Sequence, residues 1–434
     1  MSNCLYYQKE IPSLGHYPLV VLGGGPAGVC AAIEAARTGT RRVLLIESGG
    51  MLGGMATAAL VGPFMTNYDR EGNRPTVGGL YREILERLAA RSGAILPEDT
   101  DSPSIHTSFI KRYHRHVTPF DSFMLQVVLD EMVAEAGVEI LLYTRFADCV
   151  CEEGKIKSVI LAALEGLRCV SADLFIDATG NADVAAAAGV PTWKGEEESG
   201  VPQPGTLMFE VDGVSDEGYQ AHGKRPGGPT GAVKAYRTPT EGIYKINHLR
   251  VFDTDATDSA SMTKAHMEAR RQVLESYQVL QETPGFEKAR ITQVAPVLGV
   301  RESRHIEGKY KITVDDVSNG TKFEDRIAAY AFGMDVHPRN AEMKGNFKIE
   351  SANVYYVPYR AMLPIGCDNL LVAGKTVSCQ SQAAGGIRVM PCAMAIGQAA
   401  GAASAIALRD GLALDAVPTE ELQNALREHG AILD

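Results

Sequence analysis

The segment from Leu19 to Glu47 constrains the fold more than any other part of this chain. It opens with the apolar run LVVL at residues 19–22, which predicts a buried parallel strand because it is β-branched and bounded by glycine. A helix rich in small residues is expected over residues 27–36, and a second strand over residues 42–46. This order predicts the first strand–helix–strand unit of a parallel sheet in an α/β protein.

The pattern Gly23-x-Gly25-x-x-Gly28 lies between the first strand and the helix. Gly23 permits the tight turn, Gly25 lets the backbone approach a pyrophosphate, and Gly28 allows the helix to pack closely on the strand. The helix N-terminus adds unpaired N–H groups and a positive dipole end. Glu47 at the end of the second strand can accept hydrogen bonds from ribose hydroxyls, and its charge would repel a 2′-phosphate. The sequence therefore favours a dinucleotide other than NADP.

Three later segments fit a larger ligand than one nucleotide. Residues 48–57, SGGMLGGMAT, form an extended small-residue segment along which a ligand could continue beyond its first ribose. A strand at residues 173–177 leads into ATGNAD at residues 178–183. The strand NLLVAG at residues 369–374 precedes an alanine- and glycine-rich helix at residues 389–408, which contains GQAAG.

The other elements are expected to divide the chain into two folds. Residues 193–346 lack the strand–helix alternation of the first part and contain expected strands beside one long polar helix. This pattern predicts a mixed α+β domain inserted into the dinucleotide fold. Residues 95–120 show no periodicity and are interpreted as an irregular segment that covers a ligand. Helices are predicted over residues 80–90, 121–136 (closed by Gly137) and 259–281, and strands over residues 138–143, 147–150, 157–162, 166–170, 202–211, 243–251 and 289–294.

Composition excludes several classes of partner. The formal net charge of −11 argues against nucleic acid and against an anionic membrane. No apolar run reaches the length of a membrane-spanning helix, and residues 1–18 lack the features of a signal peptide, so a cytoplasmic protein is expected. The eight cysteines contain no C-x-x-C pair and no zinc spacing, which favours reduced, buried thiols and argues against a dithiol relay.

The chain carries several motifs in a fixed order. They are the glycine loop with Glu47, the LGGMATA-like segment, the IDATG strand end, the RESR sequence at residues 301–304 and the RVM…GQAAG helix. This combination resembles the bacterial FAD-dependent oxidoreductase family of the glutathione-reductase-like Rossmann superfamily, near the fumarate reductase and succinate dehydrogenase flavoproteins. The resemblance implies an α/β fold with a Rossmann-like FAD-binding domain (residues 17–192 and 347–434) and an inserted α+β substrate or cap domain (residues 193–346).

The resemblance also implies which residues hold the cofactor. Covalently flavinylated relatives carry a histidine in the early segment, where this chain has Met55-Ala56-Thr57, so non-covalent FAD is expected, with Cys379 as the remaining attachment candidate. The helix after Arg388 would direct its dipole at the reduced flavin. The expected FAD-binding residues are Gly23, Gly25, Pro26, Ala27, Gly28, Glu47, Gly53, Gly54, Met55, Ala56, Thr179, Gly180, Gly374, Gly386, Ile387 and Arg388.

Two sequences stand out as candidates for substrate chemistry. Arg301 and Arg304 in RESRH suit a carboxylate, although a structural charged strand is an equal alternative. Asp335 and His337 would share one face of a strand, where the acid would tune the imidazole pKa toward neutrality; a surface histidine before a proline turn is the alternative. Further candidates are a pocket lined by Tyr356, Tyr359 and Arg360, and a substrate-covering loop with His106, Arg112, His114, Arg115 and His116, for which no metal is expected.

Three functions remain open at the level of sequence. The first is hydride transfer between a small organic substrate and flavin N5, in the dehydrogenation of a C–OH or C–N bond with His337 as the proton acceptor. The second is a fumarate-reductase-like ene-reductase or a desaturase that uses an arginine. The third is a non-catalytic flavin-binding or electron-transfer protein. The substrate, the electron acceptor and the oligomeric state are not determined by the sequence.

Overall fold

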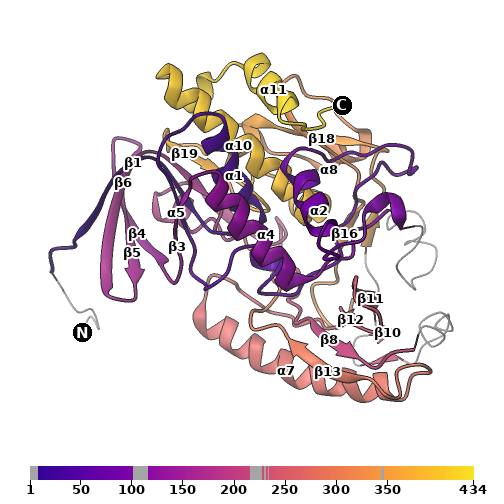
Figure 1. Ribbon diagram of the computed structural model, residues 1–434. Coiled ribbons are helices and arrows are strands. Elements are labelled where there is room, and N and C mark those ends of the chain that lie inside the picture. Colours follow the sequence, from indigo (N-terminus) through magenta and orange to yellow (C-terminus); the bar gives the residue numbers. More distant parts are fainter. Residues whose placement is uncertain (1–7, 101–115, 216–226, 229–230, 233, 344–346) are drawn as a thin grey trace.

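A seven-stranded sheet forms the centre of the fold in the computed structural model, which describes residues 8–100, 116–215, 227–228, 231–232, 234–343 and 347–434 (Figure 1). The strand order is β3-β2-β1-β6-β5-β4, and β19 pairs with β6. Strands β3, β2, β1, β6 and β19 run parallel, whereas β5 and β4 are antiparallel additions. The strands are β1 (Ser13–Leu22), β2 (Val43–Ile46), β3 (Glu139–Leu141), β4 (Arg145–Glu152), β5 (Lys155–Ala163), β6 (Gly166–Asp177) and β19 (Leu370–Val372). The predicted α/β class is confirmed.

Strand β6 is continuous where the sequence predicted two strands. Its first part pairs with β5 through Val170, and its last part pairs with β19 from Phe175 onward, while β1 accompanies most of its length. Both faces of the parallel part are buried: Leu19 and Val21 lie in one hydrophobic cluster, and Val20 and Leu22 in another. This burial explains why the run at residues 19–22 is uniformly apolar.

Helices α1 (Pro26–Arg37) and α10 (Met390–Asp410) pack against each other on the Leu19 face of the sheet (Figure 1). Their contact requires glycine, because a Cβ on Gly397 would lie 2.0 Å from the carbonyl oxygen of Ala27. By length and composition α10 is apolar enough to cross a membrane, contrary to the sequence-based expectation, yet 89% of its most apolar window is buried inside the protein. It therefore has the character of a core helix.

The remaining helices follow their sequence signals. Helix α4 begins after Asp121, whose carboxylate accepts a hydrogen bond from Met124 N at 2.8 Å, and Gly137 follows its end with a positive φ of 71°. The helices are α2 (Leu80–Ala89), α4 (Ser122–Glu135), α5 (Asp183–Ala187), α7 (Ser259–Gln281), α8 (Val314–Asn319), α9 (Ser381–Ile387) and α11 (Thr419–Glu428), with short 3₁₀ turns η1 (Gly54–Ala56), η2 (Pro97–Asp99), η3 (Tyr359–Met362) and η4 (Leu414–Ala416).

A separate antiparallel sheet packs against α7 along the lower edge of the molecule in Figure 1. Its order is β11-β12-β8-β13, formed by β8 (Phe209–Asp212), β11 (Ala235–Arg237), β12 (Tyr244–Ile246) and β13 (Arg290–Val294). Strands β8 and β12 are much shorter than the predicted strands 202–211 and 243–251. This layer has its own hydrophobic cluster, which runs from Leu207 to Leu298 and includes Leu60.

Four small two-stranded sheets complete the described part of the fold. The sheet that contains β16 (Met334–Val336) matters most for the site. Strand β16 lies directly against α9, as shown by Gly385 of α9, where a Cβ would meet Asp335 backbone atoms at 3.1 Å. The pairs are β7 (Thr192–Lys194) with β14 (Arg304–Ile306), β15 (Arg326–Tyr330) with β18 (Tyr355–Pro358), β16 with β17 (Phe347–Ile349), and β9 (Gly227–Gly228) with β10 (Gly231–Ala232).

Candidate active site

The first glycine loop joins β1 to α1 and leaves the helix N-terminus open. Gly25 caps α1 with an extended backbone, Pro26 takes the first helical position, and no side chain caps this end. A Cβ on Gly25 would meet no atom within 4 Å, whereas one on Gly28 would lie 1.8 Å from the Gly23 carbonyl oxygen. Gly28 thus serves packing, while Gly25 faces open space beside unpaired helical N–H groups.

The segment after β2 crosses directly over this loop. The Glu47 carboxylate accepts a hydrogen bond from Gly24 N at 2.7 Å, and Gly53 N donates to the Gly24 carbonyl oxygen at 2.8 Å. A Cβ on Gly54 would come within 3.0 Å of Gly25 Cα, so the two backbones touch. Met55 and Ala56 continue this segment as η1.

The end of β6 closes the loop from the other side. A Cβ on Gly23 would lie 2.3 Å from the Ala178 carbonyl oxygen, which places the ATG sequence against the glycine loop. The buried carboxylate of Asp177 accepts hydrogen bonds from Thr179 N at 3.0 Å, Thr179 Oγ1 at 2.7 Å and Ala185 N at 3.0 Å. These bonds fix the backbone turn that carries Thr179 and Gly180.

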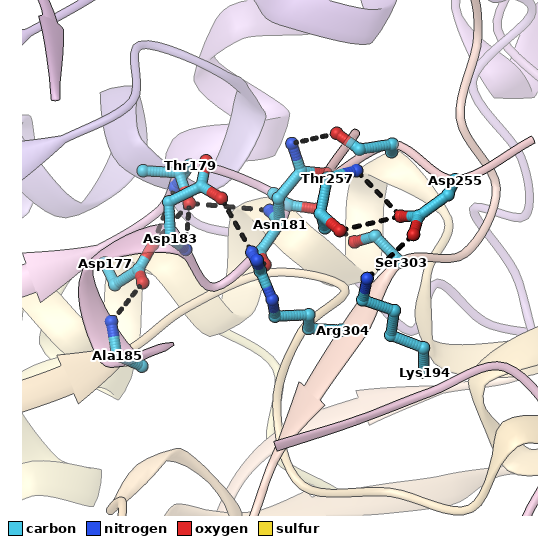
Figure 2. A network of polar contacts seen from close by, with 12 residues as sticks. Asp177, Thr179, Asn181, Asp183, Ala185, Lys194, Asp255, Thr257, Ser303 and Arg304 are labelled. Atoms are coloured by element: carbon cyan, nitrogen blue, oxygen red, sulfur yellow. Dashed lines mark hydrogen bonds and ion pairs between the residues drawn. The ribbon is translucent and has the colours of Figure 1, made fainter. Parts of the chain in front are cut away.

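Arg304 belongs to this turn and not to the Asp335–His337 pair described below. Figure 2 shows its guanidinium against the turn, where it donates to Asp183 Oδ1 at 2.8 Å and to the Asn181 carbonyl oxygen at 3.1 Å. The neighbouring Ser303 Oγ donates to the Gly180 carbonyl oxygen at 2.8 Å. The structure therefore places Arg304 as a support of the ATGNAD turn.

The C-terminal part of the chain brings Gly374 to the same place. A Cβ on Gly374, whose φ is 92°, would lie 3.2 Å from Ala27 Cβ, at the first turn of α1. Lys375, which the sequence reading overlooked although it follows the VAG strand end, contacts the Gly180 carbonyl oxygen, and burial lowers its pKa to about 8. Gly386, Ile387 and Arg388 follow at the end of α9, just before the N-terminus of α10, which no side chain caps.

These features fit FAD. Three segments far apart in the sequence converge on the open N-terminus of α1: the glycine loop, the Gly53–Gly54 crossing and the Gly374 turn. The space that a Cβ on Gly25 would fill is the space a pyrophosphate needs, and Glu47 presents a carboxylate next to it. Bound FAD would place its ADP half against these residues, as the sequence predicts.

Asp335 and His337 form a buried hydrogen-bonded pair on β16 and the residue after it. His337 Nε2 lies 2.9 Å from Asp335 Oδ2, and the His337 side chain is 7% exposed. Burial would raise the pKa of Asp335, but the bond to His337 and the charge of Arg388 hold it well below its usual range. The ionised carboxylate only accepts hydrogen bonds, so Nε2 carries the proton of the neutral imidazole.

Burial and nearby arginine charges together decide the ionisation of His337. Arg388 Nη2 donates to the Asp335 carbonyl oxygen at 3.1 Å and approaches Oδ2 at 3.4 Å. Burial and the Arg301 charge lower the pKa of His337 to about 3, although Asp335 opposes them. The expected near-neutral pKa is therefore wrong, because desolvation and the arginine outweigh the carboxylate. Burial and Arg388 likewise lower the pKa of Arg301 to about 9.

Three buried polar atoms of this cluster have no hydrogen-bond partner within the described part of the chain. They are His337 Nδ1, Arg388 Nε and Gln203 Nε2. Gln203 is held in place from both sides, since its Oε1 accepts from His337 N at 3.1 Å and its backbone N donates to Glu302 at 2.8 Å. Buried polar atoms normally have partners, so one orphaned acceptor beside two orphaned donors indicates where a ligand binds.

Glu302 is the centre of a second buried network behind this cluster. Its Oε2 accepts from Arg339 Nη1 at 2.8 Å, and its Oε1 accepts from Ser381 Oγ. Despite its burial, His305 and Arg339 lower the pKa of Glu302 to about 2. His305 Nδ1 lies 3.5 Å from Cys379 Sγ, and both side chains are buried. Sequence reasoning named Arg301 and Arg304 in this motif but missed Glu302.

Other candidates lie elsewhere. Tyr359 is buried and donates to the Leu414 carbonyl oxygen at 2.8 Å, while Arg360 pairs with Asp325 at 2.9 Å. These contacts agree with packed side chains, and the pocket lined by these residues and Tyr356 stays a prediction. His116 stacks on Tyr68 with ring centroids 4.4 Å apart. His106, Arg112, His114 and Arg115 lie outside the described residues. Gln203 and Arg250 belong to no local sequence motif, so neither could be identified from the sequence. Burial lowers the pKa of Arg250, and the charge of Asp335 opposes this effect.

The sequence profile of a family described as "FAD dependent oxidoreductase" matches residues 18–426. Among solved structures, the chain is similar to p-nitrophenol 4-monooxygenase from Pseudomonas putida DLL-E4 (11% identity, TM-score 0.50, 96% of this chain and 85% of that chain). It is also similar to a flavin-dependent brominase (14% identity, TM-score 0.50, 95% and 83% of the two chains). A geranylgeranyl bacteriochlorophyll reductase-like protein from Thermoplasma acidophilum matches with 15% identity and a TM-score of 0.49 over 95% and 83%. At these identities the two matches with a TM-score of 0.50 speak for the fold alone.

Proposed function

The chain belongs to the FAD-dependent oxidoreductase family, and from this premise we propose that it oxidises a small carboxylate-bearing alcohol or amine, with His337 as the proton acceptor. The observation that carries the proposal is the orphaned Nδ1 of His337 on a ring whose other nitrogen is bound to the ionised Asp335. FAD supplies the hydride acceptor for such a reaction.

His337 is arranged as a general base. Because Nε2 donates to Asp335, the lone pair of Nδ1 is free to take the proton of a substrate hydroxyl or ammonium group as its C–H bond is oxidised. The carboxylate holds the ring in this tautomer and stabilises the imidazolium that forms. An ene-reductase needs the opposite, a proton donor at this position.

The arginines suit the substrate carboxylate. Arg388 Nε is an unpartnered donor, and Arg301 lies close enough to lower the pKa of His337. A bound carboxylate would offset the arginine charges, so the pKa of His337 would rise in the complex. The base would then become stronger when substrate is in place, which couples recognition of the acid group to proton transfer.

A second candidate function is a fumarate-reductase-like ene-reductase, and the lowered pKa of Arg301 favours it. A guanidinium with a pKa of about 9 gives up its proton far more readily than an ordinary arginine. Arg301 would then deliver a proton to the double bond of an unsaturated acid. Its Nη1 donates to the Pro204 carbonyl oxygen at 2.6 Å, which would orient the group.

An anaerobic screen separates these functions. The oxidised holoprotein is mixed with 2-hydroxy acids, amino acids, matched neutral alcohols and nicotinamide cofactors, and bleaching of the flavin band is followed. The proposal expects bleaching by an acid and none by its neutral analogue. Reoxidation of the chemically reduced protein by an unsaturated acid, without bleaching by any saturated one, would favour the ene-reductase. Both functions would be contradicted if nicotinamide cofactors bleached the flavin but no acid did so and no unsaturated acid reoxidised the reduced protein.

A further inference from the structure

Two cysteines lie in contact on the edge strand of the central sheet. Cys149 and Cys151 are two residues apart on β4, so their side chains leave the same face of the strand, and their sulfur atoms are 3.5 Å apart. Strand β4 ends the strand order of the sheet and pairs with β5 (Figure 1). This contact is remote in the sequence from Asp335 and His337 and does not depend on the proposed function.

The backbone of β4 allows the two sulfur atoms to join. The register with β5 shifts between Val150 and Cys151, since Val150 faces Ser158 but Cys151 faces Ile156. The unpaired residue of this shift is Lys157 on β5, so the irregularity bends β5 beside the two cysteines. Residues two apart in a strand have Cα atoms roughly 6.6 Å apart, near the upper end of the range of about 4.4–6.8 Å that a disulfide spans. This separation already lies within that range.

The two thiols also differ in access. Cys151 is exposed and Cys149 half-buried, whereas Cys30, Cys367, Cys379 and Cys392 are buried. The expectation that the cysteines are buried is therefore wrong for this pair. Cys169 is half-buried too, but its sulfur faces the Ile11 carbonyl oxygen at 3.6 Å.

We propose that Cys149 and Cys151 form a redox-active dithiol, which hydrogen peroxide converts into a disulfide within β4. The Cys151 sulfur attacks one peroxide oxygen; the O–O bond breaks, water leaves and a sulfenic acid forms. The Cys149 sulfur then attacks the Cys151 sulfur; the S–S bond forms, the S–O bond breaks and a second water leaves. Two thiols are oxidised by two electrons, and one peroxide is reduced to two waters.

The surroundings assign the two roles. Burial and the neighbouring Cys151 thiol raise the pKa of Cys149, so it stays protonated in the resting protein. The Cys151 sulfur is exposed, so solvent-borne peroxide reaches it first. The charge of the flanking Asp148 also raises the pKa of Cys149, which supports its role as the second thiol to react.

Mass spectrometry tests this proposal directly. Trypsin cleaves after Arg145 and Lys155, so both cysteines lie in the one peptide formed by residues 146–155. The reduced full-length holoprotein is treated with one equivalent of peroxide, alkylated and digested. The expected result is a peptide that has lost two hydrogens and carries no alkyl group, and dithiothreitol should restore both alkylation sites. Cys151→Ser should abolish the change, and the control Cys169→Ser should leave it intact.

Three results would overturn the proposal. The first is a peptide that stays doubly alkylated after peroxide treatment. The second is Cys151 oxidised alone, to sulfinic or sulfonic acid, while Cys149 remains alkylated. The third is a cross-link between this peptide and the peptide of residues 361–375, which would make Cys367 the partner.

Discussion

At the scale of single residues, the ionisation of His337 shows how burial can dominate a local charge pair. Asp335 lies 2.9 Å away and favours the imidazolium, yet the pKa of His337 falls to about 3 because the ring is buried and Arg301 is near. The spacing of Asp335 and His337 could be read from the sequence, since alternate residues of a strand share a face. The arginine charge could not, because Arg301 arrives from a distant segment.

This environment makes a specific prediction for pH dependence. The base must be neutral to act, and with a pKa of about 3 in the free protein it is neutral throughout the physiological range. The rate of flavin reduction at limiting substrate should therefore stay flat from pH 7 to pH 5. An unperturbed histidine of pKa near 6.5 would instead lose roughly 20- to 30-fold over this interval. Anaerobic rapid mixing at a series of pH values measures the difference.

A second prediction concerns the recognition of the carboxylate. Arg301→Lys keeps the positive charge but removes the planar fork, so the dissociation constant of an acidic substrate should rise by about tenfold or more while FAD stays bound. Substrate titration by flavin reduction measures this constant. The matched control is Arg304→Lys, which alters the support of the ATGNAD turn; an equal effect of both variants would contradict the assignment.

At the scale of elements, one buried carboxylate joins the segments that position His337. Glu302 binds the backbone of Gln203, the guanidinium of Arg339 and the hydroxyl of Ser381. These residues lie ahead of β8, after β16 and at the start of α9. Glu302 of the RESR motif thus holds these elements together, and Arg304 of the same motif binds the turn after β6.

Glu302→Gln should show this role as a loss of stability. The change leaves the charge of buried Arg339 uncompensated, and breaking a buried pair of this kind costs about 3–5 kcal/mol of the free energy of unfolding. The pKa of Glu302 is lowered to about 2, so its stabilising effect is present above its unfolded value near 4.5 and is lost as the pH falls toward 2. Urea unfolding at pH 7 should therefore separate the variant from wild type more than unfolding at pH 4.

The control for this measurement is Glu428→Gln, at the exposed C-terminal end of α11. Its free energy of unfolding should stay within about 0.5 kcal/mol of wild type. If Glu302→Gln were as stable as this control at pH 7, the network around Glu302 would not hold the elements together.

At the scale of the whole molecule, the sequence predicted the parts whose signals are local. The first β-α-β unit, the helix Ser259–Gln281 and the buried strand before Gly374 lie where expected. The short strands β8 and β12 were overestimated, because apolar segments also pack as irregular chain in the inserted layer. The meeting of Gln203, Arg388 and His337 depends on long-range packing, which no local pattern records.

FAD should contribute to the stability of the entire fold, since it joins three segments. A ligand at 100 times its Kd adds about 2.7 kcal/mol to the free energy of unfolding. Gly25→Val should remove this increment, because a branched side chain would fill the space for the pyrophosphate. Thermal unfolding with and without added FAD should show a shift for wild type and none for the variant.

The early segment carries no histidine, so acid should release the flavin intact, and flavin that stays attached would contradict non-covalent binding.

The central claim is that His337 accepts the substrate proton while its ring is held by Asp335. The most direct measurement is the single-turnover rate of flavin reduction in His337→Ala, mixed anaerobically with the acid that bleaches wild type. A positioned base accounts for a factor of about 10²–10⁴ in rate. The account predicts a loss in this range, with unchanged FAD content and substrate affinity lowered at most a few-fold. Reduction at the wild-type rate would contradict it and would shift the chemistry to Arg301.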